Sequence, residues 1–259
     1  FYYTGIPLLG FFDGRMALLF TMALLLVTLW YWYRDKTIAR IAITLTALSP
    51  SVVDYFVEGR SDVFALAWLM VAMLLVRYKQ YVWSGVFLAL SFLSKQTTWF
   101  ILPFFALFLW SKNVKNTAVF WLTAIVSGAV VSVFVIPFLL WDARAFVDSV
   151  LLYLTGNTPT SYPVSGYGLG MMLYDVGVIR DIHAYYPFIL WQLAIALPFL
   201  IIVLRWLWKK PTESGVMISY ALFLFVYWYL SRYFNNSHLG YLSMLFVLGG
   251  LKAADETNT

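Results

Sequence analysis

Long segments without a charged residue constrain this chain more than any other feature. The longest apolar one covers residues 117–141, which include no Asp, Glu, Lys or Arg. A hydrocarbon core about 30 Å thick is crossed by roughly 20 helical residues. The segment therefore predicts a transmembrane helix.

Composition extends this prediction to the whole chain. Of 259 residues, 63% are hydrophobic and 11% are charged, whereas soluble domains are about 45–50% apolar and about 25% charged. Disordered, collagen-like and disulfide-scaffold classes are excluded by the same comparison. The absence of cysteine excludes thiolate metal sites and cysteine nucleophiles. We expect an integral-membrane protein whose net charge of +5 reflects its topology and not nucleic-acid binding.

Nine apolar segments are predicted to be membrane spans, so the expected fold class is an all-α polytopic bundle in one domain, 1–259. The segments cover residues 16–33, 38–53, 63–76, 81–94, 97–110, 117–141, 187–208, 215–230 and 239–251. Residues 81–110 allow two interpretations, because only Lys95 and Gln96 interrupt them. A single helix of that length measures about 45 Å at 1.5 Å per residue, which is too long for an untilted span.

The distribution of charge favours two spans there. With two spans, the loops on one side hold 11 basic and four acidic residues, and those on the other side hold six basic and eight acidic. A single span moves Lys112, Lys115, Arg205, Lys209 and Lys210 outside and removes this bias. We therefore expect a multi-pass protein of the cell membrane with its first residue outside and its C-terminus in the cytoplasm.

Residues 142–186 form the one long polar stretch, predicted to be extracytoplasmic. Asp142 is suited to cap an amphipathic helix that lies in the membrane interface and ends at Gly156. A turn-rich loop follows, with a short apolar piece at residues 169–174. At the other end of the chain, residues 253–259 are expected to be frayed.

The loop at residues 49–62 gathers charges between two predicted spans: Asp54, Glu58, Arg60 and Asp62. A charge near the bilayer centre costs roughly 2.5–3.5 kcal/mol, so these side chains are expected to line a wet cavity or the surface. The functional interpretation is a pocket for a polar substrate. The alternative is an ordinary loop in which Ser61 caps the next helix and Arg60 pairs with Glu58.

Two further polar clusters lie on the predicted outer side. Lys95 occupies a turn where the positive-inside rule disfavours cations, so its ammonium is a candidate ligand for a lipid phosphate, with Gln96 orienting a neighbour. Lys95 alternatively snorkels or pairs with an acid. In residues 231–238, Arg232 is suited to bidentate phosphate binding and His238 to titration near neutral pH. The alternative there is a solvated hairpin.

Three short motifs carry a family resemblance. Ser49-Pro50 is followed by Glu58-Gly59-Arg60-Ser61-Asp62, residues 85–96 lead into a span with Pro103, and Arg232-Tyr233-Phe234 precede the last span. Together they resemble integral-membrane glycosyltransferases of the C-type superfamily, nearest to its mannosyltransferase-like branch. The resemblance implies transfer of a sugar from a polyprenyl-phosphate carrier to an acceptor outside the cytoplasm, usually with inversion.

The resemblance also implies roles for residues. Asp54, Glu58 and Asp62 become candidate catalytic carboxylates that orient sugar or acceptor or hold a divalent metal ion. The candidate ligands of the donor phosphate are Lys95, Gln96, Arg232 and Tyr233, and the acceptor-side candidates are Arg60 and His238. The three outer loops are expected to open toward one cleft beneath residues 142–186.

Residues 1–7 look like the stretch that follows the first outer loop of such enzymes, where their key catalytic acid lies. We therefore expect the first spans and that loop to precede this chain. The expected partners are membrane lipid and a polyprenyl-phosphate sugar. The alternatives are a secondary transporter, which predicts mid-span charges and a duplicated span pattern, and a non-catalytic scaffold subunit of the same fold.

Overall fold

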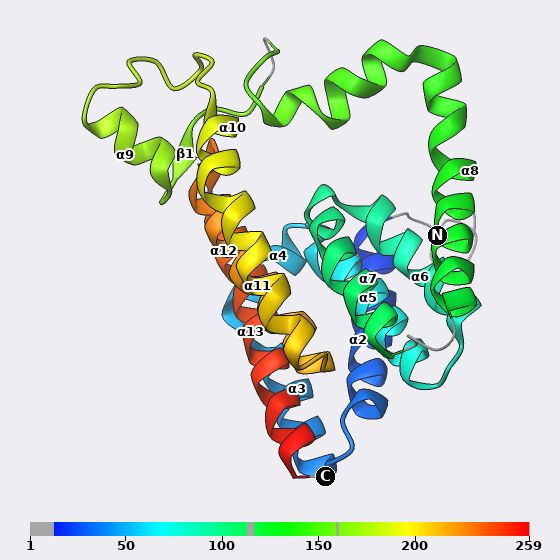
Figure 1. Cartoon of the computed structure of the whole chain (residues 1–259). Coiled ribbons are helices and arrows are strands. Elements are labelled where there is room, and N and C mark those ends of the chain that lie inside the picture. Colours follow the sequence, from blue (N-terminus) through cyan, green and yellow to red (C-terminus); the bar gives the residue numbers. More distant parts are fainter. Residues whose placement is uncertain (1–12, 113–116, 159–160, 259) are drawn as a thin grey trace.

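The computed structural model describes residues 13–112, 117–158 and 161–258, and most of them are helical (Figure 1). The elements in chain order are α2 (Arg15–Trp32), α3 (Lys36–Leu48), α4 (Pro50–Val57), α5 (Asp62–Arg77), α6 (Tyr81–Ser94), the 3₁₀ helix η1 (Gln96–Ile101), α7 (Leu102–Lys112), α8 (Thr117–Val150), η2 (Leu152–Leu154), β1 (Ser165–Gly166), α9 (Leu169–Asp175), α10 (Phe188–Trp191), the π-helical η3 (Gln192–Ala196), α11 (Leu197–Lys209), α12 (Glu213–Tyr229), β2 (Tyr233–Phe234) and α13 (Asn236–Thr257). This confirms the all-α class.

Each of the nine predicted segments coincides with a helix or with consecutive helices. Within the described residues, three helices are long and apolar enough to cross a membrane by themselves, at Arg15–Trp32, Thr117–Leu154 and Phe188–Lys209. The other helices, except α13, are shorter; α6, for example, has 14 residues. The helical segments are thus confirmed, and the count of nine spans stays a prediction.

The core lies around α5, whose buried side chains include Leu66, Leu69 and Met70 at 0% exposure. Helix α8 is the opposite case, because most of its side chains are exposed outside the bundle. It packs on α6 at Gly85, where an added Cβ would lie 2.8 Å from the carbonyl oxygen of Thr123. A glycine at this position lets the two helix backbones approach.

Helix α8 bends at Asp142, whose φ and ψ of −152° and 90° are not helical. The Asp142 carboxylate accepts a hydrogen bond from the Ala145 N–H at 2.9 Å, which confirms the predicted cap. The following residues run across one end of the molecule (Figure 1), and Gly156 adopts a φ of +89° after η2. The short apolar piece predicted at residues 169–174 forms helix α9.

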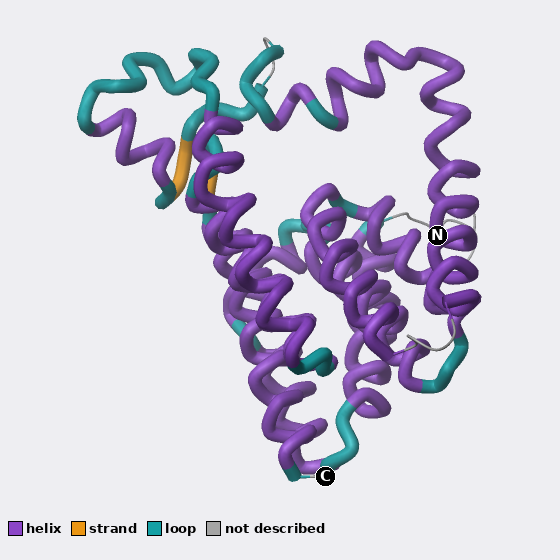
Figure 2. Tube along the Cα trace, in the orientation of Figure 1, coloured by secondary structure: helices purple, strands orange, loops and turns teal. Residues whose placement is uncertain are grey.

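Two short strands join the long loop to the turn before α13 (Figure 2). β1 pairs in parallel with β2, with Ser165 opposite Tyr233 and Gly166 opposite Phe234. A Cβ at Gly166, where φ is +93°, would collide with the Phe234 carbonyl. The absence of a side chain at Gly166 therefore allows the backbones of β1 and β2 to approach each other.

The C-terminal residues differ from the expectation of a frayed tail. Asp255 is 0% exposed and accepts hydrogen bonds from the N–H groups of Arg34 and Asp35, at 2.9 and 2.8 Å. Lys252, 2% exposed, pairs with Asp255 at 2.9 Å. The prediction was wrong because these polar side chains close the end of the bundle instead of facing solvent.

Candidate functional site

The first feature of the site is an ion pair between two helix ends. Asp62 is the first residue of α5, and Lys95 follows the last residue of α6 in an extended conformation, with φ −163° and ψ 139°. The Lys95 ammonium lies 2.6 Å from Oδ1 of Asp62. The Asp62 side chain is 8% exposed and that of Lys95 is 27% exposed, so the lysine is the partner that an external ligand can reach.

Hydrogen bonds fix the turn that carries Lys95. The Thr98 hydroxyl bridges the carbonyls of Ser91 and Lys95, at 2.6 and 2.8 Å. The Tyr220 hydroxyl donates to the Thr97 carbonyl at 2.9 Å. The Gln96 amide donates to the Val150 carbonyl at 3.4 Å, so it contacts the end of α8. The turn is therefore held from α6, α12 and α8.

The second oxygen of Asp62 has a different environment. Oδ2 is buried and, within the described part of the chain, has no hydrogen-bond partner. The charge of Asp62 acts on the phenols of Tyr220 and Tyr241, so these groups share one buried region. Among the described residues, only Oδ1 of the carboxylate is engaged, and its partner is Lys95.

The other loop charges lie at the surface. Arg60 Nε donates to Glu58 Oε2 at 2.7 Å, and the two side chains are 46% and 52% exposed. This is the pairing expected for an ordinary loop, although it leaves Glu58 accessible. Ser61 occupies the cap position of α5 without a side-chain cap. The Asp54 side chain lies outside the described part of the structure.

His238 lies in the first turn of α13, ahead of the predicted span. Its Nδ1 accepts a hydrogen bond from the Asn235 N–H at 3.1 Å. Burial lowers the pKa of His238 to about 3, and the positive charges of Lys95 and Arg60 contribute to the lowering. The expectation of titration near neutral pH is thus wrong, because the ring is desolvated and faces cations. The influence of both charges on His238 indicates that the three side chains lie in one region.

The Arg232 side chain does not face the Lys95 turn but the loop between α8 and α10. It is 2% exposed, and its guanidinium donates to the carbonyls of Tyr162, Ala184 and Ile182 at 2.5, 2.8 and 2.9 Å. It thus fastens the loop between α8 and α10. Its neighbour Tyr233 packs its ring 4.9 Å from that of Tyr162 and 5.4 Å from that of His238.

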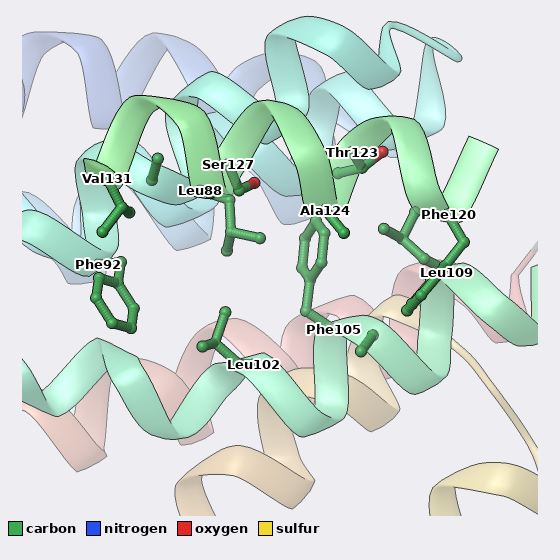
Figure 3. A pocket seen from close by; sticks show the side chains of 13 residues that line it. Leu88, Phe92, Leu102, Phe105, Leu109, Phe120, Thr123, Ala124, Ser127 and Val131 are labelled. Atoms are coloured by element: carbon green, nitrogen blue, oxygen red, sulfur yellow. The ribbon is translucent and has the colours of Figure 1, made fainter. Parts of the chain in front are cut away.

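An apolar cavity of about 330 Å³ lies between α6, α7 and α8 (Figure 3). Its walls include Leu88 and Phe92 of α6, Phe105 of α7 and Ala124 of α8. The hydroxyls of Thr123 and Ser127, which also line it, donate to the carbonyls of Val119 and Gly85. The cavity consequently offers hydrocarbon and aromatic contacts, and ligand pockets start at about 300 Å³.

Phe92 connects this cavity to the Lys95 turn. The ring of Phe92 stacks on that of Trp99, with centroids 5.0 Å apart, and the Trp99 indole donates to the Phe92 carbonyl at 2.9 Å. The sequence analysis did not identify the cavity. Alanine and glycine at lining positions 89, 106, 124 and 128 are the only signal for it, and small residues are common in any packed helix pair.

Among the described residues, no group of three or more His, Asp or Glu side chains is arranged to hold a metal ion. The expected divalent ion therefore has no assigned ligands in this part of the chain.

Comparison with known proteins gives one match. The sequence model described as glycosyltransferase family 87 matches residues 8–246. No curated protein and no solved structure matches the chain.

Proposed function

Because the chain belongs to glycosyltransferase family 87, a family of C-type integral-membrane glycosyltransferases, we propose that it transfers a sugar, of the mannose class, from a polyprenyl-phosphate carrier to an extracytoplasmic acceptor hydroxyl. In this reaction the acceptor oxygen bonds to the anomeric carbon, and the bond from that carbon to the phosphate oxygen breaks. The bond electrons leave with the carrier phosphate, and the hydroxyl proton passes to a base.

One observation carries this proposal: the partly exposed Lys95 directly follows α6, the helix whose Leu88, Ala89 and Phe92 line an apolar cavity. A lipid phosphate needs a cation for its head and a dry surface for its tail. Lys95 supplies the first, with one hydrogen-bond contact to Asp62 and further N–H donors on the same nitrogen. Negative charge that grows on the departing phosphate is stabilised by a fixed cation.

The cavity between α6, α7 and α8 supports a lipid-linked donor. It begins near Phe92, three residues before Lys95, and its lining continues to Leu109 and Phe120. A lipid whose phosphate contacts Lys95 extends its isoprenoid chain into this space. The lining does not offer free hydrogen-bond donors to a polar ligand, because its hydroxyls already donate to backbone carbonyls.

The acceptor side is assigned to the exposed loop before α5. Glu58 is 52% exposed and is accessible to an acceptor hydroxyl as a general base, with Arg60 fixing its orientation. His238 and Tyr233 border this region as neutral groups that contact the sugar. Gln96 joins the turn to the end of α8 and acts on the donor through Lys95.

The test uses the full chain in nanodiscs with geranylgeranyl phosphate, which represents the departing carrier, and the uncharged alcohol geranylgeraniol. Wild-type protein is expected to prefer the phosphate, and Lys95→Met is expected to lower this preference about tenfold, the loss typical of one charge-assisted contact. Lys209→Met, at an exposed position at the end of α11, is the matched control and leaves the preference unchanged.

Transfer is measured with radiolabelled polyprenyl-phosphate mannose and a membrane-lipid extract as acceptor. Labelled product that depends on Lys95 supports the proposal. An unchanged phosphate preference in Lys95→Met, or transfer at the wild-type rate with limiting donor, overturns it.

A further inference from the structure

We infer that Asp62 is a positioning residue for Lys95, and not a base that accepts a proton from the acceptor. The inference rests on the proposed function, because it concerns how the donor-phosphate cation is held. It assigns a role to a carboxylate that the sequence alone places among the catalytic candidates.

Accessibility is the first argument. The Asp62 side chain is 8% exposed, and Oδ2 is buried. A general base must come within hydrogen-bond distance of the proton that it removes. The single engaged oxygen of Asp62 faces the Lys95 ammonium at 2.6 Å, so the cation stands between this carboxylate and an approaching substrate.

The second argument concerns what Lys95 would do without Asp62. A lysine side chain has four flexible torsions, and fixing them costs up to about 2 kcal/mol. The backbone at Lys95 is already fixed by the Thr98 hydroxyl and by the contacts of Gln96 and Thr97. Asp62 is the one described side chain to which the ammonium donates a hydrogen bond, so it selects the direction in which the remaining N–H groups point.

The third argument is the burial of the Asp62 side chain, which is 8% exposed. Asp62 begins α5, where the unpaired N–H groups of the helix favour a negative charge. Behind it, the buried Tyr241 hydroxyl lies within the electrostatic range of the carboxylate. The Asp62 side chain is therefore confined by the core around it, and Lys95 is its one hydrogen-bond partner among the described residues.

A double-mutant cycle on the full chain in nanodiscs tests the inference. The four proteins are wild type, Asp62→Asn, Lys95→Met and the double variant, and the readout is the ratio of affinities for geranylgeranyl phosphate and geranylgeraniol. Asp62→Asn keeps the shape of the side chain, so the fold is expected to persist, and thermal unfolding in detergent verifies this. Asp62→Asn is expected to lower the ratio about five- to tenfold in the presence of Lys95, and by less than about twofold in Lys95→Met.

A merely structural role of Asp62 does not change this ratio, since it affects both ligands equally. An equal loss of the ratio in both backgrounds, or a raised ratio in Asp62→Asn, overturns the inference. The second result would show that Asp62 competes with the phosphate for Lys95. If Lys95→Met itself has the wild-type ratio, the proposed function fails instead, so the two failures are distinguishable.

A transfer assay separates positioning from catalysis. With radiolabelled polyprenyl-phosphate mannose, Asp62→Asn is expected to raise KM for the donor. The turnover rate at saturating donor is expected to change by no more than about threefold, because the variant loses only the fixed orientation of the Lys95 ammonium that binds the donor. If turnover at saturating donor instead falls by about a thousandfold, proton transfer belongs to Asp62 and the inference is contradicted.

Discussion

Gly85 of α6 lies against the Thr123 carbonyl of α8, and a Cβ at Gly85 would lie 2.8 Å from that oxygen. The same stretch of α6 and α8 forms two walls of the apolar cavity. A substitution at this contact therefore changes both helix packing and the cavity.

The first prediction concerns this contact. Gly85→Val is expected to push α8 away from α6 and to destabilise the protein by about 1–3 kcal/mol, the usual cost of overpacking. Thermal unfolding in detergent measures the change. Gly128→Ala is the control, because nothing lies within 4 Å of a Cβ at that position. Equal stability of the two variants would contradict the close packing.

The second prediction concerns the cavity. Ala124→Phe fills it and is expected to weaken binding of geranylgeranyl phosphate and geranylgeraniol about equally, by about tenfold, because both carry the same chain. Ile125 is 66% exposed on the neighbouring face of α8. Ile125→Phe is therefore the control, and its affinity for both ligands stays at the wild-type level. A loss for the phosphate alone would argue against a tail site.

The third prediction concerns Arg232. Arg232→Met leaves three carbonyls of the loop without their donor, which costs about 1–3 kcal/mol for each buried group left unsatisfied. Limited proteolysis of this variant is expected to cut residues 157–186 faster than in the wild type. Arg232→Lys is not expected to restore protection, since an ammonium lacks the planar set of N–H donors of a guanidinium. Arg180→Met, at an exposed loop position, is the control. Unchanged cleavage would show that the loop is held without Arg232.

The fourth prediction concerns pH. Burial lowers the pKa of His238 from 6.5 to about 3, so the unfolded chain binds a proton between these values that the folded protein does not bind. Stability is therefore lost as the pH falls below 6.5, by about 2 kcal/mol at pH 5 at 1.36 kcal/mol per unit. Unfolding in detergent at pH 7.5 and 5 measures this loss. His238→Gln is expected to show a smaller difference between the two pH values, and an equal difference would refute the assignment.

The fifth prediction concerns topology, and the cysteine-free chain makes it direct. A single cysteine at position 180 is expected to react with an impermeant thiol reagent added outside intact cells. One at position 209 is expected to react only after the membrane is opened, since the positive-inside rule predicts that the basic loops lie inside. The opposite pattern would invert the predicted orientation.

The sequence by itself determined the helices, because segments with almost no charge leave the backbone no other way to satisfy its hydrogen bonds in lipid. It also located the Asp142 cap and the pairing of Arg60 with Glu58, since both depend on residues three positions apart or fewer. Local chemistry of this kind is visible in a linear chain.

Tertiary structure decided which polar groups meet. Asp62 and Lys95 are 33 residues apart, and only the packing of α5 beside α6 sets which cation the carboxylate holds. Arg232 and Lys95 look alike in sequence as cations on the same predicted side. Only the folded loop presents three carbonyls to Arg232 and leaves Lys95 partly exposed, because contacts between distant segments, and not residue type, fix what each charge faces.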